Sequence, residues 1–217
     1  MHRDFFIDAR KQLIINLKQK GIVSETVLNA MLKVPREQFV PKVLSKRAYE
    51  DISLPIDKQQ TISQPFTVAR MTSLLEVKEG DKILEIGTGS GYQAAILTEL
   101  GAEVYTIERH FELHNQARIL LSTLYPQHKI YSRYGDGTIG WSEHAPYAGI
   151  IVTAGAPEIP QTLLNQLDIG GKLIIPVGDE KRQTMHCVVR QDESSFLDYP
   201  LDDYTFVPLI GKVGWKA

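Results

Sequence analysis

From residue 82 onward, short apolar runs alternate with amphipathic stretches of helical period. The apolar runs predict five strands, at Lys82–Ile86, Glu103–Ile107, Ile130–Arg133, Gly149–Thr153 and Lys172–Val177. Helices are predicted between most of these strands, at residues 92–100, 112–124 and 160–167. Two further runs, "MHCVVR" (185–190) and "YTFVPL" (204–209), are expected to complete the sheet as strands. The alternation predicts a doubly wound α/β fold, with a mostly parallel sheet covered on both faces.

The N-terminal part of the chain has a different pattern. A helical stripe over residues 4–19 ends at Gly21, and Ser24 is placed to cap a second helix. From residue 36 to residue 65 the chain is irregular, and Pro65 suits the first turn of a third helix. A long irregular segment inside a compact domain is usually functional, so we expect this one to form part of a site.

The composition is that of an ordinary globular protein, with 43% hydrophobic and 23% charged residues among 217. We expect one domain over residues 1–217, with N-terminal helices and a substrate or lid loop in 1–65 and the α/β core in 66–217. The net charge of −2 and the lack of a basic run argue against a nucleic-acid partner. No apolar stretch could span a membrane and the N-terminus has no signal-peptide core, so a cytoplasmic protein is expected. The single Cys187 excludes an internal disulfide.

A glycine-rich turn follows the first predicted strand, in "ILEIGTGSGYQAA" (83–95). Gly87, Gly89 and Gly91 lie where a strand passes into a helix, which suits a ligand lying across the first βα turn. The dinucleotide fingerprint G-x-G-x-x-G would need its last glycine at the position of Tyr92. No G-K-[ST] follows either, so a phosphate loop is excluded.

Two acidic residues follow the next two strands. Glu108 ends the second strand and could accept hydrogen bonds from both ribose hydroxyls of an adenosine. Asp136, in "GDG", could accept from the exocyclic amine of adenine. Each residue alone could be a solvated strand end or a turn residue. Glycines, ribose acid and adenine acid in this order favour S-adenosylmethionine over a pyrophosphate cofactor.

The sequence offers few groups that would activate a methyl acceptor. "IVTAGAP" (151–157) lacks the Asn/Asp-Pro-Pro-aromatic motif common in enzymes that methylate amino groups. Cys187 is expected to be a buried thiol and not the nucleophile that methylation at carbon five of a pyrimidine needs. His110 and His114 have no third ligand nearby, so no metal is expected. A carboxylate acceptor needs no base, because its pKa of about 4 leaves it ionised at neutral pH. Catalysis could then depend on alignment and desolvation.

Several segments together resemble the protein-L-isoaspartate O-methyltransferases. The match extends in order from about residue 20 to the C-terminus. Its segments are "VPREQFVP" (34–41), "AYEDISLPI" (48–56), "QTISQP" (60–65), "ILEIGTGSGYQAA" (83–95), "YGDGTIGW" (134–141) and "GGKLIIPVG" (170–178). The glycine motif occurs in many methyltransferases, whereas "QTISQP" combined with "VPREQFVP" is much more specific.

The resemblance implies a Rossmann-like class I methyltransferase with an N-terminal helical addition. It implies methyl transfer from S-adenosylmethionine, leaving S-adenosylhomocysteine, to the α-carboxylate of L-isoaspartyl residues, which starts repair through a succinimide. Ser63 is implied as the active-site residue, although it could instead cap the helix that begins at Pro65. The implied donor-binding residues are Gln60, Thr61, Ile62, Glu85, Gly87, Thr88, Gly89, Ser90, Gly91, Glu108, Asp136 and Gly137. Residues 206–215 are implied to help close the site.

The chain departs from the family pattern at two places. Asp57, Lys58 and Gln59 replace glycines that the family often has, which could stiffen or recharge the peptide entrance. Ala148 stands where an aspartate is usual. We expect a monomer that acts on isoaspartyl peptides and proteins, with no nucleic-acid or membrane partner. Three alternatives stay open: a methyltransferase for a small carboxylic acid or another oxygen nucleophile, a donor-binding sensor without turnover, and a nucleic-acid methyltransferase.

Overall fold

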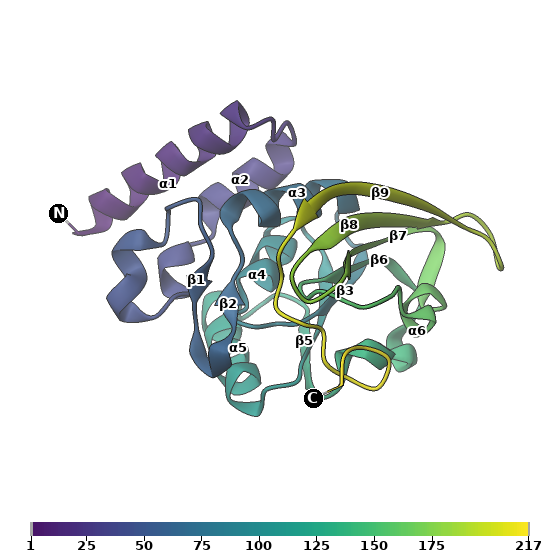
Figure 1. The fold of residues 1–217 in the computed structure, drawn as a ribbon. Helices are drawn as coiled ribbons and strands as arrows, with labels where there is room; N and C mark the ends of the chain where they lie inside the picture. The colour runs from purple at the N-terminus through teal and green to yellow at the C-terminus, as the bar shows by residue number, and fades with distance from the viewer. Residues whose placement is uncertain (1, 217) are drawn as a thin grey trace.

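The computed structural model describes the backbone of residues 2–216 and the side chains of residues 5–216 (Figure 1). Its main sheet has seven strands in the order β5-β4-β3-β6-β7-β8-β9. The strands are β3 (Lys82–Ile86), β4 (Glu103–Glu108), β5 (Ile130–Tyr134), β6 (Tyr147–Val152), β7 (Leu167–Gly178), β8 (Gln183–Arg190) and β9 (Phe196–Tyr204). β3 to β7 run parallel, and β8 and β9 are antiparallel additions at one edge. The predicted doubly wound α/β class is confirmed.

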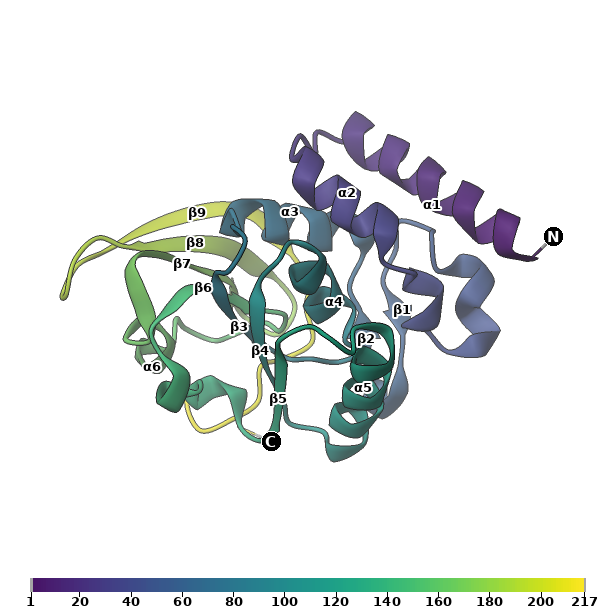
Figure 2. The same ribbon diagram turned by 180° about the vertical axis from the view of Figure 1, so that it is seen from behind.

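Helices cover both faces of the sheet (Figures 1 and 2). The helices are α1 (His2–Gln19), α2 (Glu25–Lys33), α3 (Pro65–Leu75), α4 (Tyr92–Glu99), α5 (Phe111–Leu124) and the short α6 (Gln161–Leu164). Because side chains alternate along a strand, Ile83 joins the apolar cluster under α3, α4 and α5, while Leu84 and Ile86 join the cluster on the α6 side. Both clusters are buried, so the carboxyl ends of the parallel strands are held in fixed positions relative to one another.

The N-terminal helices form an outer layer on one face. α1 packs on α2, which packs on α3 and α4, and Leu13 and Leu17 of α1 are buried in the same cluster as the sheet residues. Ser24 caps α2 as expected, since its hydroxyl accepts from the backbone N–H of Val27. None of the described helices is long and apolar enough to cross a membrane.

The irregular segment before α3 contains short elements that the pattern did not reveal. These are the 3₁₀ turns η1 (Arg36–Gln38), η2 (Lys42–Arg47) and η3 (Asp57–Gln59), and the two-stranded hairpin of β1 (Leu54–Pro55) and β2 (Thr61–Ile62). The hairpin pairs Leu54 with Ile62, whose side chains are both buried. It therefore anchors the chain just before α3 and delivers residues 60–63 to the strand ends of the main sheet.

Two predicted elements were wrong in extent. The predicted helix over 160–167 is only α6, because Leu167 already pairs with Tyr147 of the neighbouring strand. The strand predicted over 204–209 is not one: the sheet ends with β9, whose solvent-facing aspartates suit an exposed edge. Residues 205–209 instead run across the strand ends, with Gly155 N–H donating to Val207 O and Leu209 N–H donating to Gly155 O, each at 2.8 Å.

Candidate active site

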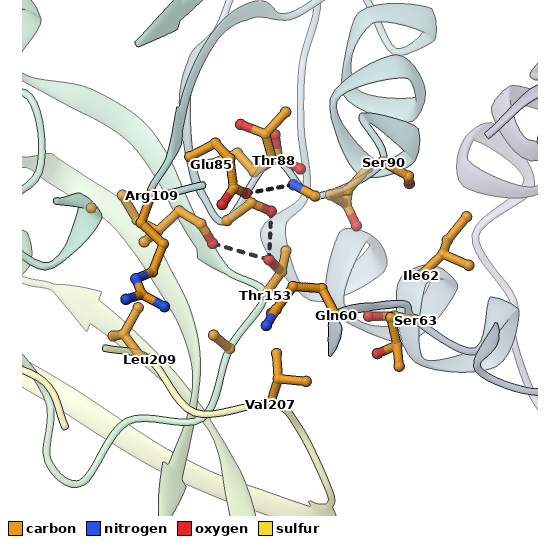
Figure 3. Close-up of a pocket in the computed structure, with 18 of the residues that line it drawn as sticks. Gln60, Ile62, Ser63, Glu85, Thr88, Ser90, Arg109, Thr153, Val207 and Leu209 are labelled. Carbon is orange, nitrogen blue, oxygen red and sulfur yellow. Dashed lines mark hydrogen bonds between the residues drawn. The ribbon is translucent and has the colours of Figure 1, made fainter. Parts of the chain in front are cut away.

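A cavity lies at the carboxyl ends of β3, β4 and β6, where the strand order changes direction (Figure 3). Ligands of open α/β sheets bind at such switch points. Eleven of the residues expected from the sequence line this cavity: Gln60, Thr61, Ile62, Ser63, Glu85, Gly87, Thr88, Gly89, Ser90, Glu108 and Gly137. The other two, Gly91 and Asp136, are not among its lining residues. We call this space the donor cavity.

The glycine turn has the backbone conformation that its residue types favour. Gly87 has φ +96°, and a β-carbon there would collide with the Thr153 hydroxyl on β6's C-terminal extension. Gly91 has φ +88°, and a β-carbon there would press against Leu121 and Ala117 of α5. Gly87 thus lets the turn approach the neighbouring strand, whereas Gly91 lets α5 approach the start of α4.

Glu108 is fixed beside this turn. Its carboxylate accepts from the backbone N–H groups of Gly89 and His110, each at 2.8 Å, and the residue is only 4% exposed. A carboxylate oxygen accepts more than one hydrogen bond, so acceptor capacity is left on the cavity side. The geometry suits a ligand that presents hydroxyl groups, as a ribose does.

Glu85 is fully buried and carries an unpartnered atom. One oxygen accepts from the Thr106 hydroxyl, and the other has no hydrogen-bond partner among the described residues. Burial raises the pKa of Glu85 to about 8, and the nearby Glu108 adds to the rise while the Thr106 hydrogen bond opposes it. A buried, unsatisfied oxygen lining a cavity suits a cationic ligand group, such as the ammonium of an amino acid.

Asp136 faces the C-terminal segment. Its carboxylate accepts from the backbone N–H and hydroxyl of Thr138, at 2.9 and 2.7 Å, and from Lys212 N–H at 2.7 Å. Burial works against its charged form, but these hydrogen bonds outweigh burial and lower the pKa of Asp136. Asp136 was predicted to accept from the adenine amine; in the structure its neighbour Gly137 lines the cavity, Asp136 holds Lys212, and the Thr138 hydroxyl accepts from Val213 N–H at 3.2 Å.

Ser63 stands where two hollows meet. It lines the donor cavity and also a second groove between α3 and the β8–β9 edge, and Thr61, Thr153 and Val207 are shared in the same way. Figure 3 shows Ser63 and Gln60 on one side of Thr153 and Arg109 on the other. Ser63 does not cap α3, because the N-cap is Gln64 and no side chain caps that end. The hydroxyl of Ser63 is therefore free of that role.

The C-terminal segment closes one side of the donor cavity. Val207, Pro208, Leu209 and Ile210 line it, and Trp215 Nε1 donates to Gly155 O at 3.0 Å. Figure 1 shows this segment leaving β9 and running back to the C-terminus. The sequence expectation that residues 206–215 border the site agrees with this course.

The unusual Asp57-Lys58-Gln59 turn is tied to α5. Lys58 Nζ lies 2.6 Å from Glu112 Oε1, and Gln116 Nε2 donates to Asp57 at 3.1 Å. Lys58 and Gln59 have positive φ angles of 59° and 56°, in the region that glycine favours. Ala148 is half-buried in β6 and packs against the core. The turn is thus held against the helix beside Ser90 and the glycine loop, away from the second groove.

Arg109 and Thr153 are two polar residues among the lining residues that were not predicted as site residues. Arg109 directly follows Glu108, so its place at the same strand end could have been inferred from that neighbour. Thr153 donates to the carbonyls of Ile86 and Gly87, at 3.0 and 2.7 Å, and joins the ends of β3 and β6. The ends of β3 and β6 are neighbours only because of the strand order of the sheet, which the sequence pattern does not reveal. Within the described residues, no three metal-ligating side chains cluster.

Known proteins share both the sequence and this architecture. The family model described as Protein-L-isoaspartate(D-aspartate) O-methyltransferase matches residues 8–214. The chain belongs to this family. A protein-L-isoaspartate O-methyltransferase of Flavobacterium psychrophilum is 51% identical over 201 residues, 93% of each chain, and one of Syntrophotalea carbinolica is 45% identical over 212 residues, 98% of this chain and 97% of that one. The chain is thus a methyltransferase.

Solved structures agree with the assignment. A protein-L-isoaspartate O-methyltransferase superposes with a TM-score of 0.84 at 30% identity, covering 94% of this chain and 67% of that one. A Plasmodium falciparum protein named as such a methyltransferase, solved with S-adenosyl-L-homocysteine, gives a TM-score of 0.80 at 26% identity and covers 93% and 98%. The chain therefore has the Rossmann-like class I methyltransferase fold, with N-terminal helices added.

Proposed function

We propose that this chain transfers a methyl group from S-adenosylmethionine to the α-carboxylate of L-isoaspartyl residues in damaged proteins and peptides. Family membership supports this substrate. The observation that carries the proposal is the meeting of two hollows at Ser63 and Thr61, one under the glycine turn and one open toward the β8–β9 edge. A donor in the first and an extended peptide in the second bring their reacting groups together at these residues.

The donor cavity suits S-adenosylmethionine. We assign its ribose to Glu108 and its amino group to Glu85. The glycine turn and residues 60–62 contact the remainder of the donor, and Gly91 and Asp136 hold the residues that line the cavity. The unpartnered Glu85 oxygen and the outward acceptor capacity of Glu108 support this fit. When bound, the cofactor supplies a methyl group on a positively charged sulfur, an electrophile that a carboxylate can attack.

The acceptor needs orientation more than activation. A carboxylate is ionised at neutral pH, so no general base is required. We assign to Ser63 the catalytic role of donating its hydroxyl to one carboxylate oxygen, which turns the other toward the donor cavity. Val207 and the segment after it exclude water from that contact, which strengthens the electrostatic interactions there. The resulting methyl ester closes to a succinimide as the backbone nitrogen displaces methanol, and hydrolysis returns some normal aspartate.

A paired-peptide assay tests the proposal. Purified protein with labelled donor should form base-labile methyl esters on an isoaspartyl peptide and none on its ordinary aspartyl twin. Esters on small carboxylic acids but not on the peptide would favour the rival methyltransferase. Calorimetric donor binding without turnover on any damaged peptide would favour a sensor.

We further propose that the chain works as a monomeric single domain in the cytoplasm, without nucleic-acid or membrane partners. The net charge of −2 supports the absence of a nucleic-acid partner, and the N-terminal helices share one apolar cluster with the sheet. Light scattering during size-exclusion chromatography should give a mass near 24.4 kDa. A mass of twice that value would contradict the monomer.

A further inference from the structure

A buried arginine lies between the N-terminal addition and the site. Arg36 belongs to η1, within the "VPREQFVP" segment, and is fully buried. Its Nε donates to Ala48 O and its Nη2 to Ser63 O, both at 2.8 Å. The second bond reaches 27 residues along the chain and ends on the backbone of the proposed catalytic residue.

The same guanidinium also contacts the donor side. Its Cζ lies 4.6 Å from the ring centroid of Tyr92, which is 2% exposed. Tyr92 is the first residue of α4 and directly follows the glycine turn. Arg36 therefore contacts three separate pieces of chain: the end of η2, the hairpin that carries Ser63, and the helix that begins at the glycine turn.

No carboxylate of the described residues makes an ion pair with this cation, and the Asp51 charge that favours it lies farther away. Among the described residues no carboxylate lies within 4 Å of it, and neither Arg36 Nη1 nor the Tyr92 hydroxyl has a hydrogen-bond partner. Burying a cation without a counter-ion costs several kcal/mol, a cost that an apolar side chain of similar volume would not have. An apolar side chain would avoid that cost but would leave the carbonyls of Ala48 and Ser63 without their donor. What the planar, forked group supplies is two donors and a flat face in fixed relative directions.

We propose that Arg36 is a positioning residue for the transfer reaction. It holds the carbonyl of Ser63, and through it the Ser63 hydroxyl, at a fixed place relative to the glycine turn before Tyr92. The inference rests on the proposed function, in which Ser63 orients the acceptor. A shift of about 1 Å between reacting groups can cost on the order of 100-fold in rate, so a residue that fixes both sides of the site affects turnover before it affects donor binding.

The test compares Arg36→Lys and Arg36→Met with Arg10→Met. Lysine keeps the charge but cannot donate along both directions while stacking on Tyr92. Arg10 is a control from the same layer, because it also donates to backbone carbonyls, those of Leu32 and Lys33, and lines neither hollow; unlike Arg36, it also pairs with Glu37. We expect both Arg36 variants to lose at least about tenfold in kcat, with S-adenosylhomocysteine affinity within about twofold of wild type. Arg10→Met should lower the melting temperature and leave kcat unchanged.

Hydrogen–deuterium exchange of the unliganded proteins gives the second measurement. Exchange should quicken in the peptide covering residues 60–64 in both Arg36 variants, and not in Arg10→Met. This measurement needs no substrate, so it judges the positioning role even if wild-type protein fails the paired-peptide assay and the proposed function falls. If Arg36→Met does not fold, Arg36→Lys decides. Wild-type kcat in Arg36→Lys, unchanged exchange in 60–64, or equal losses of kcat and donor affinity would overturn the proposal.

Discussion

The two sides of the site are built in different ways. The donor side consists of turns at the ends of adjacent parallel strands, whose heights are fixed by the sheet register: Glu85 stands opposite Thr106 on β4 and Ile151 on β6. The acceptor side consists of irregular chain, from residues 36–65 and 205–215. A two-residue hairpin and a few backbone bonds to Gly155 hold parts of it, and isolated side-chain to backbone hydrogen bonds hold the rest, such as Asp51 accepting from Phe66 N–H at 2.8 Å. The donor side is held collectively and the acceptor side bond by bond.

This difference predicts that donor affinity and turnover can be separated by mutation. Removing one hydrogen bond from the sheet changes little, because neighbouring bonds keep the register. Removing one from the acceptor side frees a whole segment, and each such bond contributes about 1 to 3 kcal/mol when a charged group takes part. Changes on the donor side should therefore act on donor affinity, and changes on the acceptor side on kcat.

The largest effect is expected from Glu108→Ala. The substitution removes the acceptor proposed for the ribose and also the partner of Gly89 N–H and His110 N–H. We expect affinity for S-adenosylhomocysteine to fall at least about 30-fold, equivalent to about 2 kcal/mol, as charge-assisted hydrogen bonds are lost. Isothermal titration calorimetry measures this value.

Glu108→Gln is the matched control, since it keeps the shape and one acceptor oxygen. Its affinity should lie between those of wild type and Glu108→Ala. An Ala variant that binds the product as tightly as wild type would remove Glu108 from the donor side of the comparison.

The same difference explains what could be predicted from the sequence. Glu108 was found because strand and glycine-turn patterns are local, and parallel strand ends meet at one edge of a sheet. The hairpin before Ser63 has two-residue strands, too short for any periodic signal, so it was not predicted, and only the family resemblance indicated Ser63. Arg36 lies in the "VPREQFVP" segment, yet nothing local predicts that its charged side chain is fully buried. The contact of Asp136 with the C-terminal segment could not be predicted, because its partner Lys212 lies 76 residues away in the sequence.

A smaller effect is expected from Ser63→Ala. Loss of the hydroxyl should lower kcat about tenfold or more, because one hydrogen bond to an ionised acceptor disappears. Affinity for S-adenosylhomocysteine should stay within about twofold, since the donor side is unchanged. Steady-state kinetics on the isoaspartyl peptide, beside calorimetry, separates the two quantities.

Ser73→Ala provides the control for Ser63. Ser73 lies in α3, the helix that follows Ser63. Its hydroxyl donates to Ala69 O at 2.7 Å, and it lines neither hollow. Its kcat should equal that of wild type. Equal kcat in Ser63→Ala as well would leave Ser63 no part in transfer and would remove the acceptor side as we describe it.

The smallest effect concerns the stability of the donor side with pH. Glu85 has a pKa of about 8 in the folded protein and 4.5 as its ordinary value. Between these values the folded protein keeps a proton that the unfolded chain releases, so the free energy of unfolding falls as pH rises through that window. The slope from this one group is about 1.4 kcal/mol per pH unit, and below pH 4.5 or above about pH 8 it vanishes.

Glu85→Gln isolates this slope, because the amide is neutral at every pH and nearly the same shape. Without ligand, the melting temperature of wild type should fall between pH 6 and pH 7 by a few degrees more than that of the variant. Parallel curves would mean that Glu85 is ionised when unliganded and has a partner in solution. A steeper wild-type curve would mean that Glu85 is protonated when the donor cavity is empty. Binding of a cationic group beside Glu85 would then require the carboxyl to release that proton.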